Sequence, residues 1–250
     1  MPSWNQSPHS FNQGTYDRVA SSIQSGGSAI ARTNTFIRTV WAWMAGGLTL
    51  TAALAWLVGT NDQLFRMVAP MMMPLSLGLI GMVFFLAWRV EKMAPQTATM
   101  VFLGYAALNG IVLSTIFRVY QLPQIGGAFV ATAGTFGAMS VYGLVTKRDL
   151  SEWRTFLMMG VFGILIASVV NIFLASDALY WVVTYAGVLV FVGLTAYDTQ
   201  KLLHLGQRIQ GVDAGVIRKY AILGALTLYM DFINLFLFLL RFFGGSRRDE

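Results

Sequence analysis

The sequence predicts an all-α membrane protein with seven transmembrane helices. Of its 250 residues, 56% are hydrophobic and only 11% are charged, and the mean hydropathy is +0.62. A soluble domain has roughly 25% charged residues, so this chain has too few to cover a globule with polar surface. Its apolar residues form seven continuous runs, each close to the ~20 residues that a spanning helix needs. Because the runs are continuous and do not alternate with polar residues, a transmembrane β-barrel is excluded.

The first 36 residues differ in composition from the rest of the chain. Ser, Gln, Asn, Gly and Thr predominate there and large apolar residues are few. We therefore expect residues 1–36 to form a disordered or membrane-surface tail, followed by a transmembrane domain over 37–245. No apolar stretch follows a basic start, which argues against a cleavable signal peptide. The end of the tail, IARTNTFIRTVW, is expected to form an interfacial helix that leads into the first span.

The predicted spans are separated by charged residues, by Pro or by short polar runs. The separating segments read TNDQLFR, RVEKMAP, YQLPQ, TKRDLSEWR, ASD and KLLHLGQRIQGVDAGVIRK. Gly and Ala recur inside the spans, where small residues let helix backbones approach closely. The spans are expected at 37–59, 68–89, 97–118, 124–146, 154–175, 178–199 and 221–243.

The Lys and Arg residues that flank the spans predict a cytoplasmic N-terminus. With this orientation twelve basic residues lie on the cytoplasmic side and five lie outside, and the C-terminus is expected outside. The C-terminal FFGGSRRDE is the one segment whose charges favour the opposite side. The cytoplasmic set is Arg18, Arg32, Arg38, Arg89, Lys92, Lys147, Arg148, Arg154, Lys201, Arg208, Arg218 and Lys219, and the outer set is Arg66, Arg118, Arg241, Arg247 and Arg248.

Two acidic residues lie in or at the edge of apolar runs, Asp198 in GVLVFVGLTAYDTQKLL and Asp231 in ALTLYMDFINLFLFLLRFF. A carboxylate at the bilayer centre costs roughly 2.5–3.5 kcal/mol by insertion assays, so it persists where it faces a partner, a cavity or an ion path. A simpler interpretation of Asp198 is that it marks the membrane interface beside Lys201. Asp231 lies ten residues into the last span and shares a helix face with Asn234. The last span is otherwise apolar on every side, which predicts that it is central in the bundle.

Four further residues are candidates for supporting these acids. Arg89, at the inner end of the second span, is a candidate counter-ion, and Tyr197 directly precedes Asp198. Asn109 and Asn171 lie in the third and fifth spans, where they are more simply interpreted as interhelical hydrogen-bonding residues than as ligands.

Residues for other chemistries are missing from the sequence. The chain has no cysteine, which excludes disulfides, thiolate metal sites and cysteine nucleophiles. An intramembrane serine protease needs a histidine within its spans. The two histidines of this chain, His9 and His204, both lie outside the predicted spans, which argues against that activity. No P-loop and no HExxH motif is present. We therefore expect no enzyme and no cofactor. The net charge of +6 lies mostly between apolar runs, so it indicates topology and lipid headgroup contacts, not nucleic acid.

The two aspartate segments, GLTAYDTQKL and ALTLYMDFINLFLFLLRFFG, together with TKRDLS and ASVVNIF, resemble the transmembrane Bax-inhibitor-motif family. The resemblance covers about residues 35–245 and is greatest to bacterial inner-membrane members. It implies seven helices, six of them surrounding the last, and a pH-sensitive calcium leak controlled by aspartates that match Asp198 and Asp231. Some bacterial relatives place a basic residue beside this pair at the end of the second helix, and Arg89 is the nearest match.

Elementary electrostatics makes such a leak plausible. Two aspartates close together in a low dielectric tend to share one proton, and carboxylates are strong ligands for calcium. The pair can therefore act as a pH sensor and as a transient calcium site. Two other functions stay open, a proton-coupled cation exchanger and a membrane-embedded regulatory or interaction protein. The expected partners are the lipid bilayer, calcium ions, protons and other membrane proteins, in a bacterial inner membrane.

Overall fold

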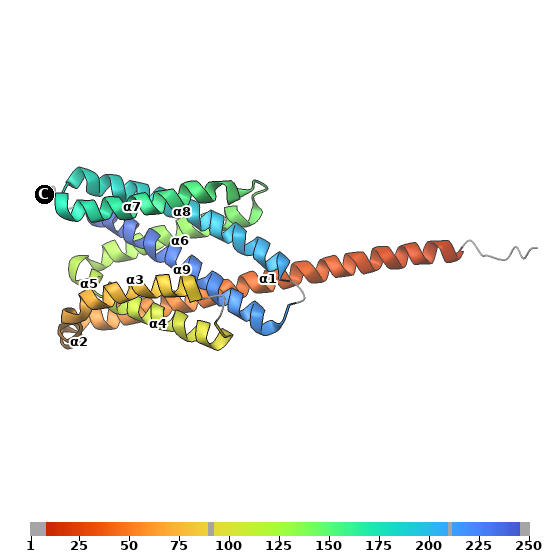
Figure 1. Ribbon diagram of the computed structural model, residues 1–250, viewed down its shortest axis with the longest axis horizontal. Helices are drawn as coiled ribbons and strands as arrows, with labels where there is room; N and C mark the ends of the chain where they lie inside the picture. Colours follow the sequence, from red (N-terminus) through yellow and green to blue (C-terminus); the bar gives the residue numbers. More distant parts are fainter. Residues whose placement is uncertain (1–8, 90–92, 210–211, 246–250) are drawn as a thin grey trace, which may run out of the picture.

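The computed structural model describes the backbone of residues 9–89, 93–209 and 212–245, and the side chains of 30–82, 93–209 and 212–244. Within these ranges the chain is a bundle of α-helices without strands (Figure 1). The helices are α1 (His9–Thr60), α2 (Asp62–Val68), α3 (Met72–Arg89), α4 (Pro95–Leu113), α5 (Ile116–Val119), α6 (Leu122–Val145), α7 (Arg154–Leu174), α8 (Asp177–Arg208) and α9 (Ala214–Gly245), with short 3₁₀ helices η1 (Ala69–Met71) and η3 (Leu150–Trp153).

The prediction of seven transmembrane helices is confirmed. Seven helical segments of the described chain are long and apolar enough to cross a membrane. Several of them extend beyond the apolar runs, because backbone hydrogen bonds continue where the side chains become polar. The segments are Ile30–Thr60, Asp62–Met82, Pro95–Val119, Leu122–Val145, Leu150–Leu174, Asp177–Arg208 and Ala214–Gly244.

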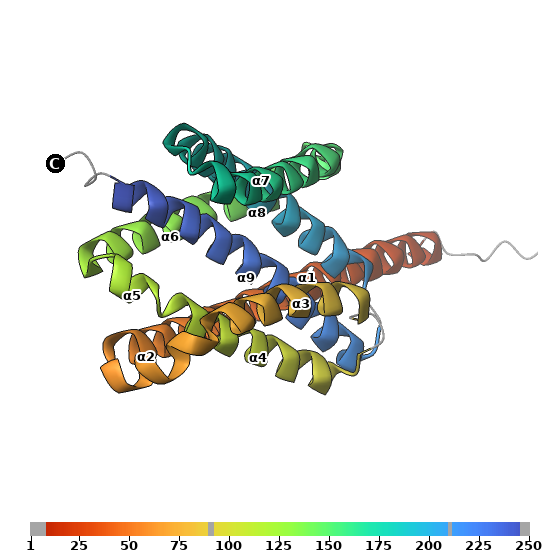
Figure 2. The same ribbon diagram turned by 60° about the vertical axis from the view of Figure 1, so that its left-hand side comes forward.

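Helix α1 differs from the expectation for the polar tail. It begins at His9 and continues without a break to Thr60, so residues 9–36 are helical where a disordered or membrane-surface tail with a helix at its end was expected. Its first part projects from the bundle (Figures 1 and 2). Its sequence contains no proline. Extending a helix that already exists requires no new nucleus, which lets this polar segment continue a helix that packing stabilises further along. The first eight residues lie outside the described part of the chain.

Helix α9 forms the centre of the bundle. In its apolar segment 61% of the residues are buried, against 6–39% in the other six spans. It packs mainly against α1, α4, α6 and α8, while α3 packs on α4 and α7 packs on α8 at the outside. Figure 2 shows α3 and α7 on opposite outer sides of the bundle. The prediction of a central C-terminal helix is confirmed, with four of the six other spans as its main neighbours.

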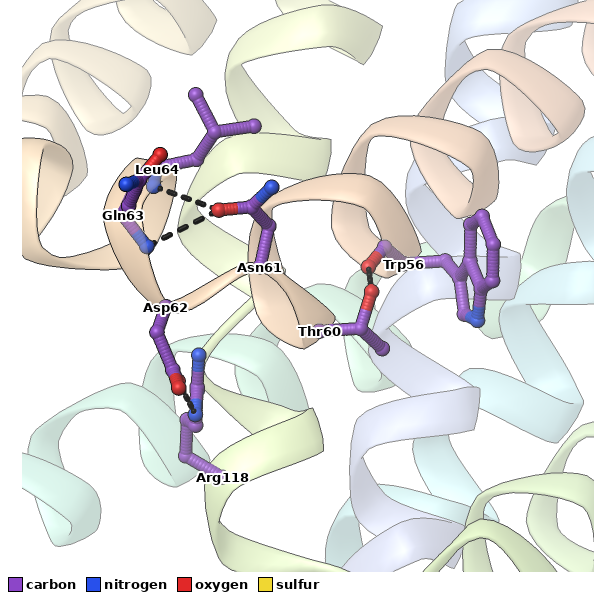
Figure 3. Close-up of polar contacts among 7 residues, drawn as sticks. All are labelled: Trp56, Thr60, Asn61, Asp62, Gln63, Leu64 and Arg118. Atoms are coloured by element: carbon purple, nitrogen blue, oxygen red, sulfur yellow. Dashed lines mark hydrogen bonds and ion pairs between the residues drawn. The ribbon is translucent and has the colours of Figure 1, made fainter.

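The two ends of the bundle differ in their connections. The α1–α2, α5–α6 and α7–α8 turns lie at one end together with the last turn of α9, and the α6–α7 and α8–α9 connections lie at the other (Figure 1). At the first end the Arg118 Nη1 atom lies 2.7 Å from Asp62 Oδ1, and the Asn61 side chain accepts hydrogen bonds from the N–H groups of Gln63 and Leu64 (Figure 3). These polar contacts are largely solvent-exposed, and exposed ion pairs contribute little to stability.

Candidate functional site

The structure brings Asp198 of α8 and Asp231 of α9 together inside the bundle. Their residues are 7% and 5% exposed, and the two carboxyl groups lie within hydrogen-bonding range of each other. Lys201 Nζ lies 3.7 Å from Asp198 Oδ1. Asp231 Oδ2 accepts no hydrogen bond from the described part of the chain. The pair thus has one acid beside a cation and one acid with an acceptor atom still available.

The two aspartates lie closer together than the ends of their predicted spans suggest. With a sixth span ending at residue 199 and a seventh beginning at 221, the two acids would differ in depth by about 10–15 Å at 1.5 Å per residue. In the structure α8 continues to Arg208 and α9 already begins at Ala214, so that each aspartate lies well inside a helix of 32 residues. The two helices pack directly against each other. Asp198 is therefore buried in the bundle interior beside α9 and is not an exposed residue of the bundle surface.

The part of α8 that carries Asp198 is buried on all sides. Residues 194–200 are all buried. The Thr199 hydroxyl donates a hydrogen bond to the Ser140 hydroxyl of α6 at 3.3 Å. One turn further along α6, Gly143 lies against the backbone of Ala196 so closely that a Cβ atom there would overlap the Ala196 carbonyl oxygen. This close approach of two backbones sets the position of α8, and with it the position of Asp198.

Two cations act on Asp198 from different helices. Lys201 lies on α8 itself, and its side chain is 61% exposed, so it connects the buried carboxyl group to the surface within one turn. The Lys201 ammonium also lies 5.8 Å from the centre of the Tyr197 ring, which gives that predicted residue a place beside the site. The second cation is Arg154, at the start of α7, whose positive charge also acts on Asp198.

Asn109 belongs to a different polar cluster, between α1, α4 and α9. It is buried, and its amide interacts with the hydroxyls of Tyr105 and Tyr229. The Tyr229 hydroxyl lies 2.7 Å from Thr51 Oγ1, which donates to the Ala106 carbonyl oxygen at 2.8 Å. This arrangement fits the interhelical role that the sequence indicates for Asn109. Thr51 was missed, because one hydroxyl in an apolar helix is an ordinary feature and no other signal distinguishes it.

The structure does not bring the other predicted residues to the aspartate pair. Asn171 Oδ1 accepts a hydrogen bond from the Ser176 N–H at 3.0 Å in the α7–α8 turn, at the opposite end of α8 from Asp198. Asn234 is half-buried and donates to the Met230 carbonyl oxygen of its own helix at 2.9 Å. Arg89 ends α3, but its side chain lies outside the described residues, so its role as a counter-ion stays a prediction.

The two carboxyl groups of the pair can supply part of the oxygen ligands that a calcium ion takes. Within the described residues no three histidine, aspartate or glutamate side chains come together as a metal-binding group. Calcium takes six to eight oxygen ligands, so two carboxylates can supply only part of its coordination.

A central apolar helix, six spans around it and a buried acidic pair define a polytopic helical membrane protein with an ionisable site in its interior. The chain matches the family described as "Inhibitor of apoptosis-promoting Bax1" over residues 33–248, and it belongs to this Bax inhibitor family. It is an integral membrane protein, and the resemblance that its motifs indicate is confirmed.

Known relatives extend over almost the whole membrane domain. The chain is 49% identical over 216 residues to inner membrane protein YbhL of Escherichia coli (strain K12), a match that covers 85% of this chain and 92% of that protein. It is 42% identical to an uncharacterized protein of Deinococcus radiodurans, covering 86% of this chain and 91% of the relative. An uncharacterized protein of Caulobacter vibrioides is 35% identical, with 95% and 98% covered.

Proposed function

We propose that this protein is a calcium-permeable leak channel whose flux depends on pH through the Asp198–Asp231 pair. The observation that carries the proposal is the meeting of two buried carboxyl groups from neighbouring transmembrane helices. Two carboxylates this close in a low dielectric tend to hold one proton between them, and the same oxygens are suited to calcium. The charge of the site therefore changes with the proton or the cation that occupies it.

Lys201 offers Asp198 an alternative partner to Asp231. While one proton is shared, a carboxyl–carboxylate hydrogen bond joins α8 to α9. When that bond breaks, Asp198 keeps the Lys201 ammonium 3.7 Å away as its partner, so it is not left as an unpaired buried charge. Because α9 packs against four neighbours, a change at Asp231 acts on the centre of the bundle. The pair thus works both as the gate and as a point of contact for the ion.

The family resemblance supports calcium as the ion that permeates, and the relative YbhL supports an inner-membrane location. The Bax-inhibitor resemblance implies a calcium leak, and the relative YbhL is named as an inner membrane protein. We place this chain in the inner membrane as well, with a cytoplasmic N-terminus. The end of the bundle formed by the α6–α7 and α8–α9 connections then faces the cytoplasm.

Purified protein in liposomes is expected to pass calcium down its gradient, at a rate that changes between about pH 6 and 8, where a coupled carboxyl pair can titrate. The exposed Asp177→Asn on α8 is the matched control and should behave as wild type. Saturating flux that requires an opposing proton gradient would instead indicate an exchanger. Absence of flux at every pH would favour an interaction protein and contradict the proposal.

The proposed orientation is tested by single cysteines, which are clean probes because the native chain has none. Gln63→Cys and Glu152→Cys lie at exposed positions at opposite ends of the bundle. A membrane-impermeant thiol reagent applied to intact spheroplasts is expected to label position 63 and to leave position 152 unlabelled until the membrane is opened. The reverse pattern would show that the orientation is wrong.

A further inference from the structure

Gln200 is a buried amide two residues beyond Asp198, and both halves of its side chain bind the connection between α6 and α7. Its Oε1 atom accepts a hydrogen bond from the Leu150 N–H at 2.8 Å, and its Nε2 atom donates to the Arg148 carbonyl oxygen at 2.8 Å. The residue is 4% exposed. Because both partners are backbone groups of one short segment, the amide holds that segment in place whatever side chains it carries.

The conformation of the α6–α7 connection, residues 146–153, is fixed by hydrogen bonds within the segment and by one buried side chain. Asp149 Oδ1 accepts a hydrogen bond from the Ser151 N–H at 2.9 Å, and Thr146 Oγ1 accepts one from the Arg148 N–H at 3.3 Å. Leu150 is buried among the apolar side chains of the core. The backbone hydrogen bond from Ser151 lowers the pKa of the Asp149 carboxyl group, so this cap is lost only as the pH falls below the ordinary range of an aspartate. The connection therefore keeps its shape at neutral pH.

The connection lies on the side of the aspartate pair that is nearer the end of the bundle. Gln200 stands between Asp198 and Lys201 along α8, and Arg154 follows the connection directly as the first residue of α7. Among the side chains that the structure describes, the charged groups that act on Asp198 are Asp231 from α9, Lys201 from α8 and Arg154 from α7. From α6 the site receives the neutral Ser140 hydroxyl, through Thr199. Two of the helices around the pair, α6 and α7, are therefore joined directly by this connection.

We propose that Gln200 is a positioning residue that holds the α6–α7 connection closed over the aspartate pair. Protons and cations reach Asp198 from this end when the two hydrogen bonds of the amide open. The regulation of calcium flux by this closure rests on the proposed function, whereas the closure itself can be measured without any flux.

The test uses a buried thiol beside the pair. Ser140 is fully buried and accepts a hydrogen bond from Thr199, the neighbour of Asp198, so Ser140→Cys reports whether water enters there. In nanodiscs, a cationic water-soluble thiol reagent should label Cys at this position slowly in the otherwise native chain. Adding Gln200→Leu, which removes both hydrogen bonds at similar size, is expected to speed labelling about tenfold or more. Gln200→Glu keeps the acceptor and loses the donor, and should give an intermediate rate.

Gln124→Leu is the matched control. Gln124 also makes two hydrogen bonds to backbone groups, accepting from the Gln121 N–H at 2.9 Å and donating to the Phe243 carbonyl oxygen at 3.4 Å, but at the opposite end of the bundle. It should leave labelling at position 140 unchanged. Labelling of the exposed Gln63→Cys, which lies outside the connection, at one rate in all backgrounds, with a cooperative thermal transition, shows that the variants are folded.

An unchanged labelling rate at position 140 in folded Gln200→Leu or Gln200→Glu protein would overturn the closure. Equal acceleration by Gln124→Leu would overturn it too, because it would show a general loosening of the bundle. In liposomes, Gln200→Leu is expected to shift the pH at which calcium flux is half-changed, and Gln124→Leu is not. Faster labelling in a protein that passes no calcium at any pH would contradict the proposed function and leave the closure supported.

Discussion

Replacing Asp231 by Asn is expected to abolish the pH dependence of calcium flux between about pH 6 and 8, the range that a coupled, buried carboxyl pair can reach. Asparagine keeps the size of the side chain but cannot share or release the proton. Within the described residues, the remaining acid, Asp198, then has the Lys201 ammonium 3.7 Å away and the Arg154 charge as ionic neighbours. The measurement is the initial rate of calcium entry into liposomes across this pH range.

Asp198→Asn should remove the pH dependence in the same way, because either change leaves one titratable carboxyl group where two were coupled. The level of the constant flux is expected to differ between the two variants, since only Asp231→Asn keeps an acid beside Lys201. Asp62→Asn is a control from the exposed ion pair with Arg118 at the other end of the bundle and should retain the wild-type profile (Figure 3). A wild-type pH response in Asp231→Asn would refute the assigned role.

The second large effect is expected at Gly143, where α6 lies against the backbone of α8. An alanine Cβ would overlap the Ala196 carbonyl oxygen, and a backbone atom cannot move aside as a flexible side chain can. The helices must separate, at a cost of about 1–3 kcal/mol, as is typical for overpacking. Thermal unfolding in detergent should therefore begin at a lower temperature in Gly143→Ala. The separation also displaces Asp198, two residues from the contact, so the pH profile of calcium flux should change.

Gly137→Ala is the matched control, since Gly137 lies on the same helix and a Cβ there meets nothing within 4 Å. Alanine is a better helix former than glycine, so this variant should be as stable as wild type or slightly more stable. Equal stability of the Gly143 and Gly137 variants would show that α6 and α8 are farther apart than the structure has them.

The number of spans could be predicted from the sequence, because the length and continuity of apolar runs decide which segments can cross a bilayer. Their ends could not. The apolar run of α8 ends near Thr199, but the helix continues to Arg208, since hydrogen bonding of the backbone does not stop at the membrane surface. Helix α1 extends in the same way to His9, through residues whose polar composition suggests disorder.

The candidate site could be predicted in part. Asp198 and Asp231 were identifiable because a carboxyl group in an apolar run is energetically costly and usually has a partner or a function. Their contact was not identifiable, because it follows from how α8 and α9 pack against each other. Gln200 has no such signal: its bond to Leu150 joins residues 50 positions apart in the sequence. An uncharged amide at the end of a span is ordinary until its partners are known.

The central place of α9 also determines the order of assembly. Chains are made from the N-terminus, so the six other spans enter the membrane before the helix on which four of them pack. Until α9 arrives, Asp198 lacks its acidic partner and the inner faces of α1, α4, α6 and α8 have only each other, lipid or the insertion machinery to cover them. The bundle therefore reaches its final packing in one late step, when the last span is inserted among helices already in place.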